Sequence, residues 1–177
     1  GDGWEVAQSL NPLDPTDAAQ DVDHDALNNL REYEHGTNPR VADSDGDGLL
    51  DGAEVDQHQT NPLSPDTDGD HMPDGWEVAN ALLPRNAADA IEDPDQDELT
   101  NLREFHCGTN PHEADTDGDD VTDGEESRIG TDPLDPASHP ARISGMLSYA
   151  GRQPGTDRVY VIQGGVLTQA LPATFAR

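Results

Sequence analysis

Acidic side chains recur along this chain at a spacing that could bind metal ions. Five Asp-rich runs fit one frame of twelve residues, with Asp at positions 1, 3 and 5, Asp or Asn at position 9, and Glu at position 12. We number them frames 1 to 5: Asp21, Asp23, Asp25, Asn29 and Glu32; Asp43, Asp45, Asp47, Asp51 and Glu54; Asp66, Asp68, Asp70, Asp74 and Glu77; Asp93, Asp95, Asp97, Asn101 and Glu104; Asp115, Asp117, Asp119, Asp123 and Glu126. The second half of a further frame opens the chain, with Asp2 at position 9 and Glu5 at position 12.

This order of oxygen ligands is typical of a calcium loop. Calcium takes six to eight oxygens, and the EF-hand loop supplies them from positions 1, 3, 5, 9 and 12 and from the backbone carbonyl of position 7. Position 7 is apolar in every frame, so its carbonyl can face the ion while its side chain faces a small core: Leu27, Leu49, Met72, Leu99 and Val121. Hard oxygen ligands disfavour zinc and copper, and magnesium prefers a tighter octahedral site. The sequence therefore predicts at least five Ca²⁺ sites.

Position 6 departs from the usual loop, which has Gly there for a sharp turn. Only Gly48 supplies it, and frames 1 and 4 have Ala26 and Glu98 in its place. These two frames also have Asn at position 9. We therefore expect them to be the weaker or differently shaped sites.

The frames belong to a duplicated unit. Residues 1–54 align with residues 73–126 without a gap, and the register is 72 residues throughout. Gly3-Trp4-Glu5-Val6-Ala7, for example, recurs as Gly75-Trp76-Glu77-Val78-Ala79. A solvated acidic tail would keep neither the frame nor the period, so the pattern indicates a structural repeat. The equivalent residues Trp4 and Trp76 are interpreted as packing anchors of the repeat rather than as a sugar-stacking face.

Composition bounds what such a chain can do. It has 38 acidic and nine basic residues and a net charge of −29, which excludes a phosphate-binding face and disfavours nucleic acid and anionic membranes as partners. No apolar run is long enough to insert into a membrane. Fewer than a fifth of the residues are Leu, Ile, Val or Phe, a composition typical of disorder. We therefore expect folding and metal binding to be one event.

The links between frames are too short for the helix pairs of an EF-hand. Gly36-Thr37-Asn38-Pro39 and its near copies follow most frames, and a Gly four residues after the frame Glu predicts the end of a one-turn helix such as 30–35. The longer links at 4–13 and 76–83 could hold a slightly longer helix. The fold class is thus a mostly irregular, calcium-stabilised repeat array with short helices.

The Asp-x-Asp-Gly-Asp runs, the Asp-Gly-x-Glu ends and the Gly-Thr-Asn-Pro links together resemble thrombospondin type 3 repeats in their bacterial, cysteine-free form. The resemblance covers about residues 1–136. It implies an array wrapped around a row of calcium ions in an extracellular or cell-surface protein, and it suggests the link residues Asn38, Asn61, Asn110 and Asp132 as ligands of second ions. The single Cys107 departs from the cysteine-stapled animal members, so no disulfide framework is expected.

A change of composition near residue 140 predicts two regions, an array at 1–140 and a β segment at 141–177. The second region holds one acid, Asp157, and four Arg. We expect strands at 143–149 and 159–162 and a third after Gly164-Gly165, a small antiparallel segment that is an incomplete sandwich or a sheet shared between subunits.

The function that fits best is structural: a metal-stiffened rod that serves as a filament subunit, through self-association of its incomplete ends, or as a spacer between neighbouring domains of a surface protein. A dockerin-like calcium-dependent protein-binding module is the alternative. A calcium sensor is disfavoured because sensors need helix pairs that open around an apolar groove. No arrangement of Ser, His, Asp or Cys suggests catalysis, so we expect no enzyme activity.

Overall fold

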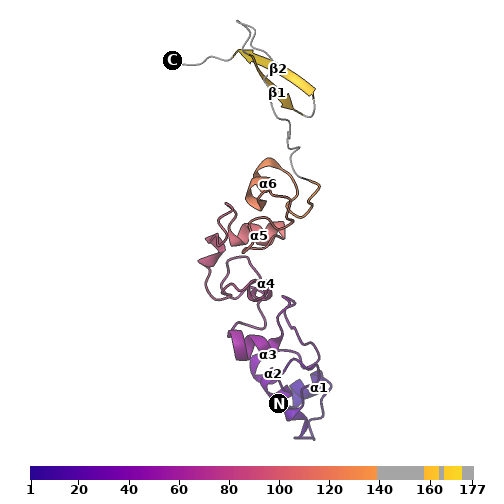
Figure 1. Ribbon diagram of the computed structural model, residues 1–177. Helices are drawn as coiled ribbons and strands as arrows, with labels where there is room; N and C mark the ends of the chain where they lie inside the picture. The colour runs from indigo at the N-terminus through magenta and orange to yellow at the C-terminus, as the bar shows by residue number, and fades with distance from the viewer. Residues whose placement is uncertain (139–157, 164–165, 173–177) are drawn as a thin grey trace. The chain divides into compact units, whose positions relative to one another are not determined.

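The computed structural model describes residues 1–138, 158–163 and 166–172. The chain divides into two compact units, Gly1–Ser138 and His139–Arg177. In the first unit the elements follow one another in chain order (Figure 1): α1 (Asp2–Ala7), η1 (Asp17–Ala19), α2 (Asn29–His35), α3 (Asp51–Ala53), η2 (Glu54–His58), α4 (Asp74–Ala79), η3 (Asp89–Ile91), α5 (Asn101–Cys107) and α6 (Asp123–Ile129). This unit has the predicted architecture of short helices joined by irregular loops. Among the described residues, no helix has the length and apolar character needed to cross a membrane.

In the second unit the structure describes one antiparallel pair, β1 (Arg158–Gln163) and β2 (Val166–Pro172). Val159 lies opposite Leu171, and the register shifts between Val161 and Ile162. The strand predicted at 143–149 lies outside the described residues.

All five frames share one loop backbone, because the position-1 carboxylate organises it. In frame 2, Asp43 accepts hydrogen bonds from the backbone N–H groups of Gly46 at 2.7 Å and Gly48 at 3.0 Å. The same pair of bonds, from positions 4 and 6, occurs at Asp21, Asp66, Asp93 and Asp115. Each frame then closes on itself, since the position-9 N–H donates to the carbonyl just before position 1, as from Asp51 to Ala42 at 3.0 Å.

Frames 1 and 4 have the same loop backbone as the other frames, so the alternative of a differently shaped loop is wrong, and weaker binding at these two sites stays a prediction. Ala26 and Glu98 adopt the left-handed conformation, with φ of 79° and 82°, as Gly48 does at 97°. The two hydrogen bonds to the position-1 carboxylate hold this conformation without a glycine. Its cost for a residue with a Cβ is about 1–2 kcal/mol.

Each α-helix of the first unit begins at position 9 of a frame. The helices α2, α5 and α6 end at Gly36, Gly108 and Gly130, all with φ near 80°, as the sequence predicts. The prediction of longer helices in the long links is wrong. The helices that enter these links, α1 and α4, have six residues, one fewer than the seven of α2 and α5. Ser9 and Ala81 turn left-handed, at φ of 60° and 56°, and each long link later contains one 3₁₀ turn, η1 or η3.

The interior of the first unit is largely polar. Its buried apolar side chains are Leu27, Met72, Ala90, Leu99 and Val121. Four of these are position-7 residues, as predicted, whereas the fifth position-7 residue, Leu49, is only half-buried. Aromatic pairs add small packing centres: Trp4 lies edge-on to Tyr33 at 5.3 Å between centroids, and Trp76 to Phe105 at 5.2 Å. The two tryptophans therefore act as packing anchors. Most remaining buried side chains are carboxylates and amides of the frames.

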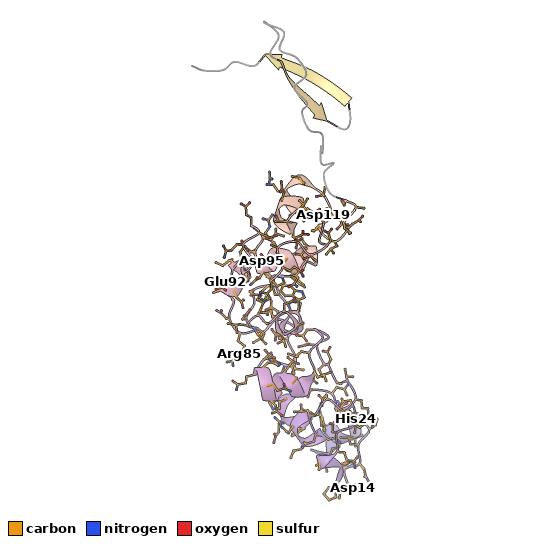
Figure 2. All side chains as sticks on the ribbon, in the orientation of Figure 1. Asp14, His24, Arg85, Glu92, Asp95 and Asp119 are labelled. Atoms are coloured by element: carbon orange, nitrogen blue, oxygen red, sulfur yellow. The ribbon has the colours of Figure 1, made fainter. Side chains whose placement is uncertain are left out.

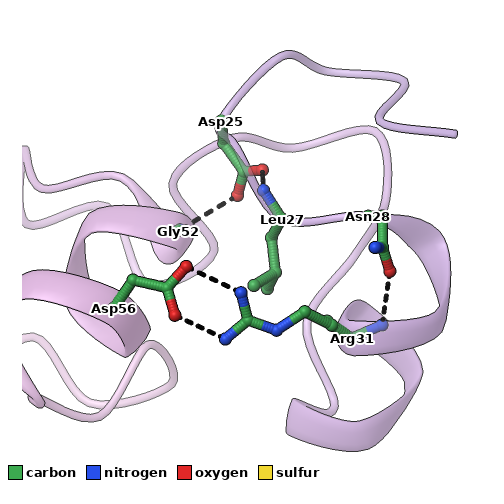
Figure 3. Close-up of polar contacts among 6 residues, drawn as sticks. All are labelled: Asp25, Leu27, Asn28, Arg31, Gly52 and Asp56. Carbon is green, nitrogen blue, oxygen red and sulfur yellow. Dashed lines mark hydrogen bonds and ion pairs between the residues drawn. The ribbon is translucent and has the colours of Figure 1, made fainter. Parts of the chain in front are cut away.

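Frames 2, 3 and 5 each contact the preceding frame at the Gly of position 10. The backbone N–H of Gly52 donates to the position-5 carboxylate of the preceding frame, Asp25, at 3.3 Å, and Figure 3 shows this bond beside the one from Leu27. Gly75 donates to Asp47 in the same way at 2.9 Å. A Cβ on Gly75 would lie 2.5 Å from the Asp47 carbonyl oxygen, so only glycine allows this approach. An exposed ion pair adds to the contact between frames 1 and 2, since Arg31 donates to both carboxylate oxygens of Asp56 at 2.7 and 2.6 Å.

The close approach at Gly75 gives the first testable prediction. Gly75→Ala should lower the free energy of unfolding of the calcium-loaded chain by about 1–3 kcal/mol, because the methyl group forces frames 2 and 3 apart. Gly3→Ala is the matched control, since Gly3 is the equivalent residue and a Cβ there meets nothing within 4 Å. It should have no effect or stabilise by up to about 1 kcal/mol. Equal effects of both substitutions in urea unfolding would contradict the close contact.

The left-handed residue Glu98 gives a second prediction. Glu98→Gly should raise the free energy of unfolding by about 1 kcal/mol, because glycine adopts φ of 82° without the Cβ penalty. Glu92→Gly removes the same exposed charge at a residue with φ of −75°, so it should not stabilise the chain. A gain in both variants would show that charge, and not backbone strain, is responsible.

Candidate metal centres

The structure brings together the acids of positions 1, 3 and 5 within a frame. Carboxylate oxygens of Asp21, Asp23 and Asp25 lie within 4.8 Å of one another, and those of frames 2 and 3 form the same groups: Asp43, Asp45 and Asp47; Asp66, Asp68 and Asp70. Positions 1 and 5 accept backbone hydrogen bonds, and so does Oδ1 of position 3 in frames 2 to 5. Position 3 carries buried oxygens with no hydrogen-bond partner, both oxygens at Asp23 and Oδ2 at Asp45, Asp68, Asp95 and Asp117. Figure 2 places three of the frames along the first unit through His24, Asp95 and Asp119.

The position-12 glutamates are completely buried, as are the position-9 aspartates Asp51, Asp74 and Asp123. All five have no exposed surface: Glu32, Glu54, Glu77, Glu104 and Glu126. Both carboxylate oxygens lack a hydrogen-bond partner in every one except Glu54, whose Oε1 accepts from the Thr60 hydroxyl at 3.2 Å. An unpaired, ionised carboxylate buried in protein costs several kcal/mol, so these side chains require a cation or a proton.

The position-9 carboxylates lie beside acids of the preceding frame. The sequence analysis did not predict this arrangement. Asp51 groups with Asp25 and Glu32 of frame 1, again with ligand atoms within 4.8 Å. Asp74 groups with Asp47 and Glu54 of frame 2 in the same way. Position 9 was expected to serve its own loop, and the structure places its carboxylate between one frame and the next. Each such group contains two or three fully buried acids.

Position 2 holds the position-9 carboxylate in place. Thr67 donates to Asp74 from its backbone N–H at 2.8 Å and from its hydroxyl at 2.6 Å. Ser44 and Asp51 form the same pair of bonds, as do Thr116 and Asp123. The hydroxyl also accepts from the backbone of the preceding link, as from Asn61 at 2.9 Å. A Ser or Thr at position 2 therefore accompanies every Asp at position 9 of the complete frames.

Frames 1 and 4 have neither partner, because Val22 and Pro94 occupy position 2 and Asn29 and Asn101 occupy position 9. The Asn101 Nδ2 donates to the backbone carbonyl of Asp89 at 2.8 Å, and Asn29 donates to Asp17 at the same distance. Asp17 and Asp89 lie in the 3₁₀ turns of the long links and are buried. The sequence analysis left both out because they fall outside the frames. Their shared position, twelve residues before an Asn at position 9, is the signal that could have found them.

The half frame at the start of the chain and the link residues have other surroundings. Glu5 lines a hollow of about 40 Å³ together with Asp17 and Asn29, whereas Asp2 is exposed in α1. The link oxygens suggested for second ions accept backbone hydrogen bonds two residues on, as Asn110 does from His112 at 3.1 Å and Asp132 from Leu134 at 3.1 Å. These side chains form Asx turns.

The buried carboxylates of the frames lie close to one another, so their ionised forms need a nearby positive charge. Burial, and then the charge of neighbouring aspartates, raises the pKa of Glu77 to about 9, of Glu54 and Glu104 to about 8, and of Asp45 to about 6. Burial raises the pKa of Glu32 to about 7. All potential side-chain ligands in the frames are hard oxygen donors. Several carboxylates with unpartnered oxygens around one point fit Ca²⁺ and do not fit a soft metal.

The raised pKa values predict how stability depends on pH. In chelator, the folded state binds protons that the unfolded state releases above about pH 4.5, so its stability should be greatest in acid and should fall as pH rises through 7 to 9. With excess calcium the trend should reverse in acid, because protons compete with the ion. Near-UV circular dichroism of Trp76, which packs on Phe105, reports both states. A chelated chain that becomes more ordered from pH 5 to pH 9 would contradict the assignment.

Comparison with known proteins finds a family match for two of the five frames. The model of the bacterial TSP3 repeat matches residues 43–65 and 115–136, which are frames 2 and 5 with their following links. No curated protein and no solved structure matched the chain. The two matched segments begin 72 residues apart, at equivalent points of the duplicated unit. Residues 43–65 and 115–136 are therefore similar to the bacterial TSP3 repeat, a calcium-binding repeat of the thrombospondin type 3 kind.

Proposed function

We propose that the chain is a structural, non-catalytic calcium-binding array that serves as a metal-stiffened spacer in an extracellular or cell-surface protein. The observation that carries this proposal is the complete burial of the five position-12 glutamates, with at least one unpartnered oxygen on each. One ion at each of them gives at least five Ca²⁺. The groups that combine position 5, position 12 and the next position 9 have ligands for further ions between frames.

Stiffness follows from the way in which the frames share ligands. Asp25 of frame 1 accepts a hydrogen bond from Gly52 of frame 2, and its carboxylate lies close to that of Asp51, also of frame 2. Carboxylates of both frames therefore contribute to one group. Asp47 joins frames 2 and 3 through Gly75 and Asp74. An ion bound at such a group would cross-link two frames, and a series of these cross-links resists bending.

The outside of the cell suits this chemistry. Extracellular calcium modules bind with dissociation constants of about 10⁻⁴ to 10⁻³ M, and calcium at that level is constantly present there. The chain is also poor in the features of a sensor, since the helices of residues 1–138 have three to seven residues and are too short for the helix pairs of an EF-hand. A stable array fits these features better than a calcium-triggered switch.

Small-angle X-ray scattering in calcium and in chelator, with electron microscopy beside it, tests the proposal. We expect single, extended, well-defined particles in calcium and coil-like scattering in chelator. Fibres in calcium would make the chain a filament subunit. A compact globule in calcium, or identical curves in both conditions, would contradict the spacer.

A substitution at Glu54 tests the ion assignment. Glu54→Gln should reduce the ion count by one and weaken the neighbouring sites, because a neutral amide offers one oxygen in place of a bidentate carboxylate. Glu34→Gln is the control, since Glu34 is exposed on α2. Calorimetric titration measures both, and an unchanged stoichiometry for Glu54→Gln would remove Glu54 from the ligands.

A further inference from the structure

Where a long link follows a frame, the group of acids between that frame and the next lacks the carboxylate of position 9. Where the next frame has Asp at position 9, as Asp51 and Asp74, that carboxylate joins the acids of positions 5 and 12. Frame 3 is followed by a long link, and the next position 9 is Asn101, a neutral amide. The group around Asp70 and Glu77 would therefore have one carboxylate fewer than the groups of frames 1 and 2.

Asp89 lies where it can replace that carboxylate. It begins the 3₁₀ turn η3, its side chain is 3% exposed, and its Oδ1 is buried without a hydrogen-bond partner. Its Oδ2 accepts from the backbone N–H of Leu83 at 2.9 Å, which fixes the carboxylate. Asn101, which is fully buried, donates to the Asp89 carbonyl at 2.8 Å and leaves its own Oδ1 without a partner.

Two observations direct these oxygens at frame 3. The backbone N–H of Leu82 donates to the Glu77 carbonyl at 2.8 Å, and the next residue, Leu83, is the donor to Asp89, so the link returns Asp89 to the end of frame 3. The equivalent residues of the first half of the chain, Glu5, Asp17 and Asn29, line one hollow. Glu77, Asp89 and Asn101 have the same spacing in the second half and make the same hydrogen bonds as that trio.

We propose, on the basis of the calcium function above, that Asp89 is a calcium ligand supplied by the link and that Asn101 completes the same centre. The centre consists of Asp70, Glu77, Asp89 and Asn101. It is a second type of inter-frame site, in which a carboxylate from the 3₁₀ turn takes the place of the position-9 Asp. The longer link is then the segment that brings this ligand in.

Asp17 offers a matched control. Asp17 makes the same hydrogen bonds as Asp89, accepting from Asn11 at 2.9 Å and from Asn29 at its carbonyl, but in this 177-residue chain no acids at positions 1, 3 and 5 accompany Glu5. Asp89→Asn and Asp17→Asn therefore disturb equal turns and unequal metal centres. Each Asn keeps an oxygen that can accept the backbone hydrogen bond.

The experiment counts calcium ions by native mass spectrometry and measures affinities by calorimetry for the wild type and both variants. We expect Asp89→Asn to lose one ion, or to bind one ion at least about tenfold more weakly, and Asp17→Asn to match the wild type. Equal loss of thermal stability in both variants with no change in ion count would make Asp89 a turn residue only and overturn the inference. A wild type that binds no calcium would instead refute the proposed function itself.

Discussion

The burial of ionisable carboxylates is the constraint on which the rest of the molecule depends. Glu32, Glu54, Glu77, Glu104 and Glu126 occupy the interior that apolar side chains fill in an ordinary domain. Apolar burial is correspondingly slight, with five buried apolar side chains in residues 1–138. The conformational entropy of the chain, about 1–2 kcal/mol per residue, must therefore be offset largely by interactions with bound cations. Loops, helices and links are arranged to present oxygens, and the α-helices are short because each begins at position 9 of a frame and ends close to position 12.

The sequence predicted the local structure well because the frames are local devices. The position-1 carboxylate binds backbone groups three and five residues on, so a twelve-residue pattern is enough to define the loop. The Gly36 and Gly108 helix ends and the buried position-7 side chains follow from the same short-range rules. The shape of frames 1 and 4 was wrongly predicted from the missing glycine, because two hydrogen bonds hold Ala26 and Glu98 in a conformation that their residue types alone disfavour.

What the sequence did not predict is the sharing between frames. Placing Asp51 with Asp25 and Glu32 requires knowing how one loop stacks on the next, and no pattern within a single frame contains that information. Asp17 and Asp89 were missed for the same reason, since they lie outside the frames and become visible only when the link is folded back. The Gly at position 10 has the same origin: Gly75 is required by the carbonyl of Asp47, 28 residues earlier in the chain. The duplicated unit thus alternates two ways of joining frames, a short link with Ser or Thr at position 2 and Asp at position 9, and a long link with Asn at position 9 and an Asp in a 3₁₀ turn.

The central claim is that calcium ions neutralise the buried glutamates. A crystal structure of the chain grown in calcium, with anomalous difference density collected at long wavelength, tests it most directly. The account predicts a calcium peak within about 2.3–2.6 Å of the carboxylate of each of the five position-12 glutamates. Glutamates that are buried without an anomalous peak, sharing protons with the neighbouring aspartates, would contradict it.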